Sequence, residues 1–307
     1  MDIRKMMMDP AGLLVQGITG RQGRMEVEWM LNSGTKITAG VTPGRGGESV
    51  HGVPVYNSVS EAVRTHRNVV SMSYVPRGAA SDAAIEAVEA GIRLNVMSAE
   101  NVPLHRLVAA IAAAERARAI LVGPNSQGIM IPDVGRIGCP GGVDPERRFS
   151  AGPVGVVSRS GGMASEISLL LRQWGWGTSV QLSLGGSPLT GLRLDEAAQL
   201  VQADKRTRVL VVFGEPSGDQ EFALAARVRK AALPINVVAM IPGVVADAFP
   251  ADLPFGHAPR AGADGVGTTT ESKIEALSVA GIPVARSFND LRKTLSGWLA
   301  PGGTLNG

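Results

Sequence analysis

The most constraining feature of the chain is a regular alternation of short apolar runs with longer helix-like segments. The apolar run at residues 12–16 ends in a glycine turn, and a helical pattern follows at residues 22–33. Strands that alternate with helices at this spacing predict an α/β fold with a parallel, doubly wound sheet. The first half is predicted to contain further strands at 36–41, 69–75, 93–97 and 120–122, and helices at 61–65, 79–90 and 104–117.

The second half repeats this alternation after a break. Residues 137–153 are rich in Gly, Pro and charge, which favours a linker. A chain of 307 residues is long enough for two domains, and we place them at residues 1–145 and 146–307. The second domain is predicted to contain strands at 154–158, 180–184, 209–213 and 235–241, and helices at 162–174, 194–203, 221–232, 272–280 and 289–299.

Composition and charge argue against several classes of function. The net charge is only +3 and the Lys and Arg residues are scattered, so we expect no nucleic-acid binding. Cys139 is the only cysteine, so no disulfide or thiolate metal site forms within the chain, and we expect no metal ligands on it. We find neither a signal peptide nor a membrane-spanning run, which together with the lone cysteine predicts a cytoplasmic protein without membrane association.

A glycine turn near the N-terminus has the geometry of a phosphate site. Gly17, Gly20 and Gly23 lie between a strand and a helix, so the backbone and the helix N-terminus can approach a phosphate. The acidic residue that usually holds a dinucleotide ribose is missing, and the second strand leads to Arg45 instead. A cation there suits a ligand with an extra phosphate, such as coenzyme A or NADP; a purely structural turn is the alternative.

The second half carries a turn of the same type and a histidine that suits phosphoryl transfer. The sequence Ser158-Arg159-Ser160-Gly161-Gly162 follows a strand and opens a helix, whose free amides favour an anion. Glu215 follows another strand, where its carboxylate could accept the ring N–H of an imidazole and leave the other nitrogen nucleophilic. His257 lies in the glycine-led sequence Phe255-Gly256-His257-Ala258, whereas the other histidines read as ordinary polar residues.

Together these motifs resemble the α subunit of succinyl-CoA synthetase (succinate–CoA ligase) over residues 13–299. The resemblance implies a Rossmann-like CoA-binding domain followed by a flavodoxin-like ligase domain. It implies that His257 is phosphorylated and that Glu215 orients it. It also implies a set of coenzyme A contacts, namely Thr19, Gly20, Arg21, Gln22, Arg45, Ser98, Ala99 and Glu100. A second implied set binds phosphate or substrate, namely Asn125, Ser160, Gly161, Gly162, Ser165 and Arg260.

Several positions depart from the pattern of the succinate enzymes. The segment Gly162-Met163 is more similar to ATP-citrate lyase and other acyl-CoA ligases, and Ser165 stands where the succinate enzymes have Tyr. The family usually has Lys in place of Arg45. After His257, Pro259 removes an amide donor and Arg260 adds a cation. These changes put succinate as the substrate in doubt more than they affect the reaction class.

The chain has no GxxxxGK[ST] loop, and nothing in it resembles a complete ATP site. The resemblance therefore implies an ATP-grasp β subunit as partner, in an αβ or α2β2 complex, which binds ATP or GTP with Mg. The expected function is that of a nucleoside-diphosphate-forming acid–CoA ligase acting on a small carboxylate or sulfonated polyanion, such as succinate, malate or citrate. The alternatives are a non-catalytic CoA-binding regulatory subunit and, less favoured, an NADP-dependent oxidoreductase.

Overall fold

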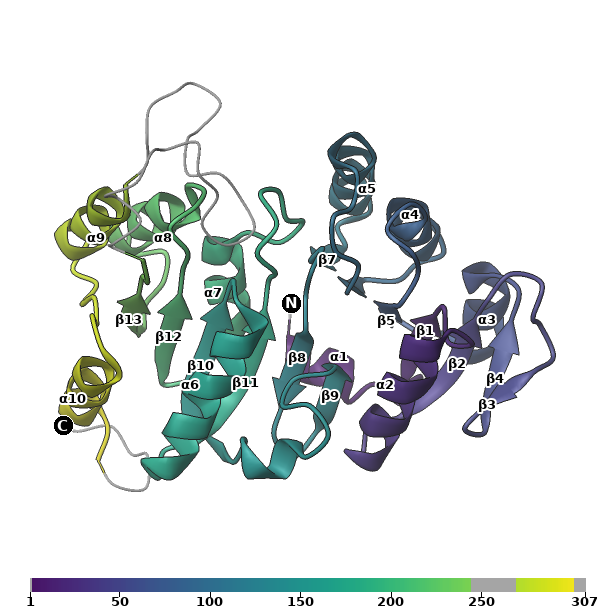
Figure 1. The fold of residues 1–307 in the computed structure, drawn as a ribbon, viewed down its shortest axis with the longest axis horizontal. Coiled ribbons are helices and arrows are strands. Elements are labelled where there is room, and N and C mark those ends of the chain that lie inside the picture. The colour runs from purple at the N-terminus through teal and green to yellow at the C-terminus, as the bar shows by residue number, and fades with distance from the viewer. Residues whose placement is uncertain (1, 244–268, 301–307) are drawn as a thin grey trace. The chain divides into compact units, whose positions relative to one another are not determined.

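A computed structural model describes residues 2–243 and 269–300 of the chain (Figure 1). The chain forms two compact units. The first comprises Asp2–Pro145 together with Leu189–Leu192, and the second comprises Glu146–Pro188 together with the chain from Arg193 onward.

The first unit is built on a mostly parallel sheet whose strands run in the order β3-β4-β2-β1-β5-β6-β7. Every neighbouring pair is parallel except the antiparallel pair β3–β4. An antiparallel hairpin of β8 and β9 follows. The strands are β1 (Leu13–Gln16), β2 (Ile37–Val41), β3 (Ser49–Val50), β4 (Val53–Tyr56), β5 (Val70–Ser73), β6 (Leu94–Met97), β7 (Ile120–Val122), β8 (Gly128–Ile131) and β9 (Gly135–Gly138).

Alanine-rich helices pack on this sheet. Ala84 of α4 and Ala110 and Ala113 of α5 are buried in one cluster, because their small side chains let the two helices approach closely. Ser58 begins α3 by accepting a hydrogen bond from the Glu61 amide at 3.2 Å. The helices of this unit are α1 (Ile3–Met7), α2 (Arg21–Asn32), α3 (Val59–His66), α4 (Ala80–Glu89) and α5 (Leu104–Ala117).

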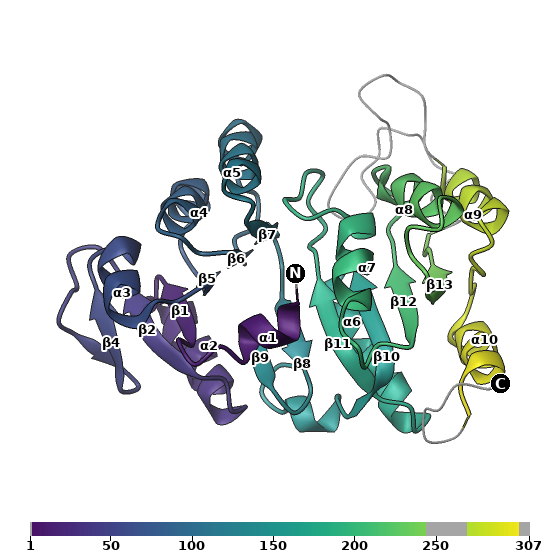
Figure 2. The same ribbon diagram turned by 180° about the vertical axis from the view of Figure 1, so that it is seen from behind.

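In the second unit, parallel strands run in the order β13-β12-β10-β11. The strands are β10 (Ala151–Ser158), β11 (Thr178–Ser183), β12 (Val209–Phe213) and β13 (Asn236–Met240). The helices are α6 (Gly161–Gln173), α7 (Leu194–Gln202), α8 (Gln220–Arg229), α9 (Thr270–Val279) and α10 (Phe288–Trp298), and a short 3-10 helix, η1 (Pro145–Arg147), precedes β10. Figure 2 gives the view from behind.

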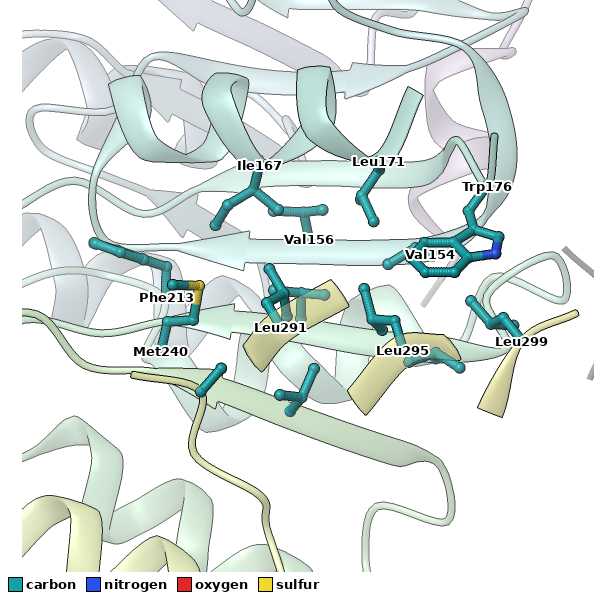
Figure 3. Close-up of a cluster of buried hydrophobic side chains, with 14 of the residues drawn as sticks. Val154, Val156, Ile167, Leu171, Trp176, Phe213, Met240, Leu291, Leu295 and Leu299 are labelled. Carbon is teal, nitrogen blue, oxygen red and sulfur yellow. The ribbon is translucent and has the colours of Figure 1, made fainter. Parts of the chain in front are cut away.

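Apolar side chains of α6 and α10 form the core over one face of these strands (Figure 3). Ile167 of α6 and Leu291 of α10 pack with Val156 of β10. The intervening residue Gly155 points to the opposite face, where an added Cβ would lie 2.6 Å from Val201 Cγ1 of α7. Alternation along β10 therefore gives each face its own helical cover.

The structure confirms the α/β class with its two mostly parallel sheets, a Rossmann-like N-terminal part and a second α/β part. The predicted linker at 137–153 is wrong at both ends, because β9 extends to Gly138 and β10 begins at Ala151. The carbonyl of Ser150 accepts a hydrogen bond from the Thr178 amide at 2.7 Å, so this glycine-containing stretch already pairs with the next strand. Short elements also lie outside the prediction, namely α1, β3, β4, β8 and β9.

In the part of the chain that the structure describes, every helix is too short or too polar to cross a membrane. Across residues 2–243 and 269–300, no group of three or more His, Cys, Asp or Glu side chains is arranged to hold a metal ion.

Candidate functional site

The glycine turn of the first unit brings the start of α2 against the end of β1. The Gly17 amide donates to the Val41 carbonyl at 2.8 Å, and the Gly20 amide donates to the Gly17 carbonyl at 3.1 Å. A Cβ on Gly23 would overlap the Gly17 carbonyl oxygen, so this position requires glycine. The turn thus presents the N-terminal amides of α2 at the carboxyl edge of the sheet.

This edge is a topological switch point, where the strand order reverses. The chain passes from β1 to β2 on one side and later returns to β5 on the other side of β1. Ligands of open α/β sheets bind in the crevice at such points. A cavity of about 630 Å³ lies there, lined by Gln16, Gly17, Thr19, Gly20, Val41, Thr42, Pro43, Tyr74, Val75, Pro76, Ala79, Asp82, Ala83 and Glu86.

Only some of the predicted coenzyme A contacts line this cavity. Thr19 and Gly20 do, and the Thr19 hydroxyl donates to the Thr42 hydroxyl at 3.2 Å. Arg21 and Gln22 lie in the first turn of α2 with exposed side chains, and Gln22 donates to a Glu26 carboxylate oxygen at 2.9 Å. The apolar walls and the nearby helix N-terminus suit a ligand that combines an apolar part with phosphates.

Arg45 follows the cavity-lining segment Thr42-Pro43 but pairs with a neighbour. Its guanidinium forms a forked ion pair with the Glu48 carboxylate, with Nη2 at 2.9 Å from Oε2. The hydrogen bond between them raises the pKa of Arg45 and lowers the pKa of Glu48. The contact of Arg45 with coenzyme A stays a prediction. It requires that the Arg45 guanidinium bind the ligand while it is still paired with Glu48, or that the ion pair open.

The remaining predicted contacts of this unit meet at the ends of the next two strands. After β6, the Ser98 hydroxyl donates to the Ser73 carbonyl at 2.8 Å. After β7, the Asn125 amide donates to the Ala99 carbonyl at 2.9 Å, which joins the two turns. Glu100 is exposed beside them. These residues share the carboxyl edge with the cavity but do not line it.

Tyr74 and two carboxylates of α4 line the cavity without having been predicted. Burial raises the pKa of Tyr74 well above its ordinary value, so its hydroxyl stays protonated. Its position at the end of β5, the strand beside β1, is the signal that could have identified it. Asp82 and Glu86 carry no such signal, because acidic residues on a helix usually face solvent.

The second unit repeats the arrangement at the ends of β10 and β12. Ser158 and Phe213 are register partners, and the Arg159 amide donates to the Phe213 carbonyl at 3.0 Å. The chain passes from β10 to β11 on one side and then to β12 on the other, so this edge is also a switch point. The start of α6 and the Glu215 segment are therefore brought together.

The first turn of α6 is open toward this edge. Ser160 begins the helix, and its hydroxyl accepts a hydrogen bond from the Met163 amide at 3.4 Å. Gly161 is half-buried, and a Cβ on Gly162 would meet nothing within 4 Å. Ser165 is buried one turn further along. The turn leaves room for an anion close to the helix N-terminus.

Glu215 is buried at the same edge, with 6% of its surface exposed. The Ser217 hydroxyl lies 3.4 Å from Glu215 Oε2, and Arg159 Nη2 lies 3.9 Å from the same oxygen. Arg159, only 1% exposed, also donates to the carbonyls of Ser217 and Ser187 at 2.9 and 3.0 Å. Sequence reasoning missed the role of Arg159, although a cation directly after an apolar strand marks a buried, functional charge.

His257 and Arg260 lie outside the described residues, but the chain on either side of their segment ends beside Glu215. A Cβ on Gly243 would lie 2.6 Å from Pro216 Cγ. The Thr270 hydroxyl donates to the Gly243 carbonyl at 3.4 Å. Gly243 and Thr270, which lie close in sequence to the two ends of that segment, are therefore joined to each other, and Gly243 packs against the Glu215 segment.

Two family models match the chain. The model described as CoA binding domain matches residues 9–101, and the model described as CoA-ligase matches residues 157–282. The first contains the cavity-lining glycine turn, and the second contains the α6 turn and Glu215.

Curated relatives match over nearly the whole chain. A succinate–CoA ligase [ADP-forming] subunit alpha 2 from Archaeoglobus fulgidus is 41% identical over 90% of this chain and 92% of its own. The corresponding subunit from Methanothermobacter thermautotrophicus is 38% identical over 88% of this chain and 89% of its own. An ADP-forming sulfoacetate-CoA ligase subunit from Acholeplasma is 36% identical over 88% of this chain and 90% of its own.

A solved structure shares the fold. ATP citrate lyase from Methanothrix soehngenii, in complex with citrate and coenzyme A, aligns with a TM-score of 0.82 at 22% identity. The alignment covers 93% of this chain and 49% of that one. With its CoA-binding and CoA-ligase regions and relatives of this identity, the chain belongs to the family of succinate–CoA ligase α subunits, which are subunits of acid–CoA ligases.

Proposed function

We propose that the chain is the catalytic α subunit of a nucleoside-diphosphate-forming acid–CoA ligase that works through a phosphorylated His257 oriented by Glu215. The observation that carries the proposal is the meeting of three features at one sheet edge. These are the open first turn of α6, the buried Glu215 carboxylate, and Gly243 and Thr270 at the two ends of the His257 segment. An anion site, an imidazole partner and a tethered histidine are what phosphoryl transfer through histidine needs.

The proposed reaction has three transfers. The γ-phosphoryl group of the nucleotide moves to a ring nitrogen of His257, and the nucleoside diphosphate leaves. A carboxylate oxygen of the acid then attacks this phosphorus and the imidazole leaves, which gives an acyl phosphate. The thiol sulfur of coenzyme A attacks the acyl carbon, phosphate leaves and the thiol proton passes to solvent. Throughout, the Glu215 carboxylate accepts the second ring N–H and fixes the tautomer.

The substrate we propose is a small dianionic acid. Relatives named for succinate and for sulfoacetate both act on acids with two anionic groups. Ser160, Gly161 and Gly162 at the start of α6 suit one anionic group, and Arg260 adds a cation for another. With Ser165 in place of a tyrosine, we expect room for a sulfonate or a longer carboxylate beside succinate.

The nucleotide site is proposed to lie on a β subunit of the ATP-grasp type. The named relatives are α subunits or subunits of ADP-forming ligases, which supports a two-subunit enzyme and ADP as the product. Coenzyme A is proposed to bind at the cavity beside Gly17, Thr19 and Gly20, within the region matched by the CoA-binding model.

The test is the intact mass of the chain, purified in complex with a co-expressed β subunit and incubated with Mg-ATP. We expect an acid-labile gain of one phosphoryl group that is absent in His257→Ala. His105→Ala is the matched control, because His105 is an exposed histidine on α5, and it should keep the gain. Coenzyme A binding, measured by calorimetry, should be unchanged in both variants.

The outcomes separate the alternatives. A phosphoryl gain that persists in His257→Ala would show that another residue carries the group and would overturn the proposal. No gain in the unmodified complex, with coenzyme A still bound, would favour a non-catalytic CoA-binding subunit. The named relatives are ligase subunits, which favours ligation over an oxidoreductase. Screening succinate, malate, citrate and sulfoacetate for acyl-CoA formation then identifies the acid.

A further inference from the structure

A fully buried ion pair lies directly behind Glu215. Lys273 in the first turn of α9 and Glu221 in the first turn of α8 are both 0% exposed, and Lys273 Nζ lies 2.9 Å from Glu221 Oε2. A buried ion pair is weak evidence for stability, because desolvation of the two charges offsets their attraction. Stability alone therefore does not explain why this ion pair is buried here.

The pair holds both sides of the Glu215 backbone. The Glu215 amide donates to Glu221 Oε1 at 3.0 Å, and the Glu215 carbonyl accepts a hydrogen bond from Lys273 Nζ at 2.8 Å. The same ammonium group donates to the Ser217 carbonyl at 3.0 Å. The Lys273 ammonium group thus donates to two carbonyls of this segment and forms an ion pair with the Glu221 carboxylate.

The fit around the pair is too tight for a side chain at the preceding position. A Cβ on Gly214 would overlap Glu221 Oε1 and would lie 2.6 Å from Ile241 Cδ1. The carbonyl of Ser217 also accepts a hydrogen bond from Arg159 Nη1 at 2.9 Å, so a second buried cation fixes the far side of the segment. The Gly214 amide still donates to the Met240 carbonyl at 3.0 Å, and the three charged side chains of Arg159, Glu221 and Lys273 hold the residues that follow.

We infer that Lys273 and Glu221 are positioning residues that fix the backbone of Glu215 and so aim its carboxylate at the histidine of the reaction. The inference rests on the proposed function of Glu215 and His257. Charge-assisted hydrogen bonds to the Glu215 amide and to its carbonyl restrict the two peptide units that flank the Glu215 Cα. These two peptide units set the Cα–Cβ direction of Glu215, so a loss of the pair misdirects the carboxylate without removing it.

Lys273 also lies close in sequence to the described residues that follow residues 244–268. It lies five residues after residue 268, on the helix that Thr270 ties to Gly243. Burial lowers the pKa of Lys273, and the Glu221 carboxylate opposes this shift. One ammonium group therefore links the segment of the orienting carboxylate to the helix that follows the phosphorylated residue.

The experiment measures the single-turnover rate of phosphoryl gain in the αβ complex with saturating Mg-ATP. Lys273→Met removes the donors to both carbonyls at similar volume. We expect the rate to fall about 10- to 100-fold, the range expected when a reacting group is misplaced by about 1 Å. The matched control is Arg227→Met, which removes another ion pair of α8, to Asp195 at 2.6 Å, that does not touch the Glu215 segment. Its rate should stay within about 3-fold of the unmodified chain, the ordinary range for context-dependent effects.

A double-mutant cycle with Glu215→Gln separates positioning from general destabilisation. If Lys273 acts through the Glu215 carboxylate, Lys273→Met in the Glu215→Gln background lowers the rate by less than about 3-fold further. If Lys273 had only a structural role, Lys273→Met would lower the rate in the Glu215→Gln background by the same factor as in the unmodified chain. Native-state hydrogen exchange on peptides from β10 and β12, which belong to the second unit, checks that this unit of each variant is folded.

If Lys273→Met alone does not fold, Glu221→Gln/Lys273→Met decides the question, because it leaves no unpaired buried charge. The inference stands if the deciding variant, which is Lys273→Met where it folds and the double variant otherwise, is slow and non-additive with Glu215→Gln. It is overturned if that variant gains the phosphoryl group at the unmodified rate, or if its loss multiplies fully with that of Glu215→Gln. A complex whose unmodified chain gains no phosphoryl group contradicts the proposed function instead.

Discussion

Replacing Gly17 with alanine tests whether the glycine turn of the first unit is required by close approach or only by backbone conformation. Gly17 has a φ of +75°, and a Cβ there would lie 2.6 Å from the Tyr74 carbonyl oxygen. Gly34, at the end of α2, provides the matched control. Its φ is +81°, but a Cβ there would meet nothing within 4 Å. The two substitutions share the conformational cost, and Gly17 differs from Gly34 in its contact with the Tyr74 carbonyl and in lining the cavity.

The magnitudes follow from these two costs. A left-handed conformation costs an alanine roughly 1–2 kcal/mol, which is the whole expected loss for Gly34→Ala. Gly17→Ala adds an overlap with backbone that cannot rotate away, and overpacking of this kind costs roughly 1–3 kcal/mol more. Because Gly17 also lines the cavity, the shift that relieves the overlap moves the first turn of α2. We expect coenzyme A affinity to fall at least about 10-fold, equivalent to ~1.4 kcal/mol.

The assay is native-state hydrogen exchange on peptides from β1 and β5, which reports the free energy of opening of this unit alone. Calorimetric titration with coenzyme A gives the affinity in parallel. We expect the protection of β1 and β5 to fall further in Gly17→Ala than in Gly34→Ala, with affinity lost only in the former. Equal losses of protection and equal affinities in the two variants would refute the close-approach argument.

Three further outcomes are expected. Burial raises the pKa of Cys139 to about 12, so at pH 8 the folded chain should react with iodoacetamide about 10³-fold more slowly than the urea-unfolded chain; equal rates would contradict this. Arg136, which is 0% exposed, donates to the carbonyls of Trp29 and Pro140 at 2.8 and 3.0 Å, so Arg136→Met should cost ~3 kcal/mol in the same hydrogen-exchange assay. If Arg45 contacts the extra phosphate of coenzyme A, Arg45→Ala should weaken coenzyme A about 10-fold but leave dephospho-coenzyme A unchanged in calorimetry; an equal loss for both ligands would place the contact elsewhere.

Elements with strong local patterns are predictable from the sequence, and elements defined by distant pairing are not. Three elements match their predicted bounds, namely the helix Leu104–Ala117 and the strands Ile120–Val122 and Val209–Phe213. Alanine content favours the helix and apolar runs favour the strands, and both signals lie within the segment itself. The hairpin β8–β9 has a glycine at the start of one strand opposite a glycine at the end of the other, where the two backbones touch. In sequence those glycines read as a loop.

The same limit applies to the candidate sites. The α6 turn and Glu215 are both predictable, since each directly follows an apolar strand and parallel strands end at one edge. Lys273 contacts Glu215 across 58 residues, and only the packing of α9 shows the contact. The pairing of Arg45 with Glu48 is local, yet it depends on how the turn after β2 folds.

The segment Leu189–Leu192 has a consequence for dissecting the protein. It belongs to the first unit although residues on both sides of it belong to the second, and its Gly191 amide donates to the Gly123 carbonyl at 2.9 Å. Gly191 also packs so closely against Leu121 that an added Cβ would overlap the Leu121 carbonyl oxygen. A fragment ending at Pro145 would leave the end of β7 uncovered. We therefore expect the isolated CoA-binding region to be more stable when a short peptide equivalent to Leu189–Leu192 is fused to it or added in trans.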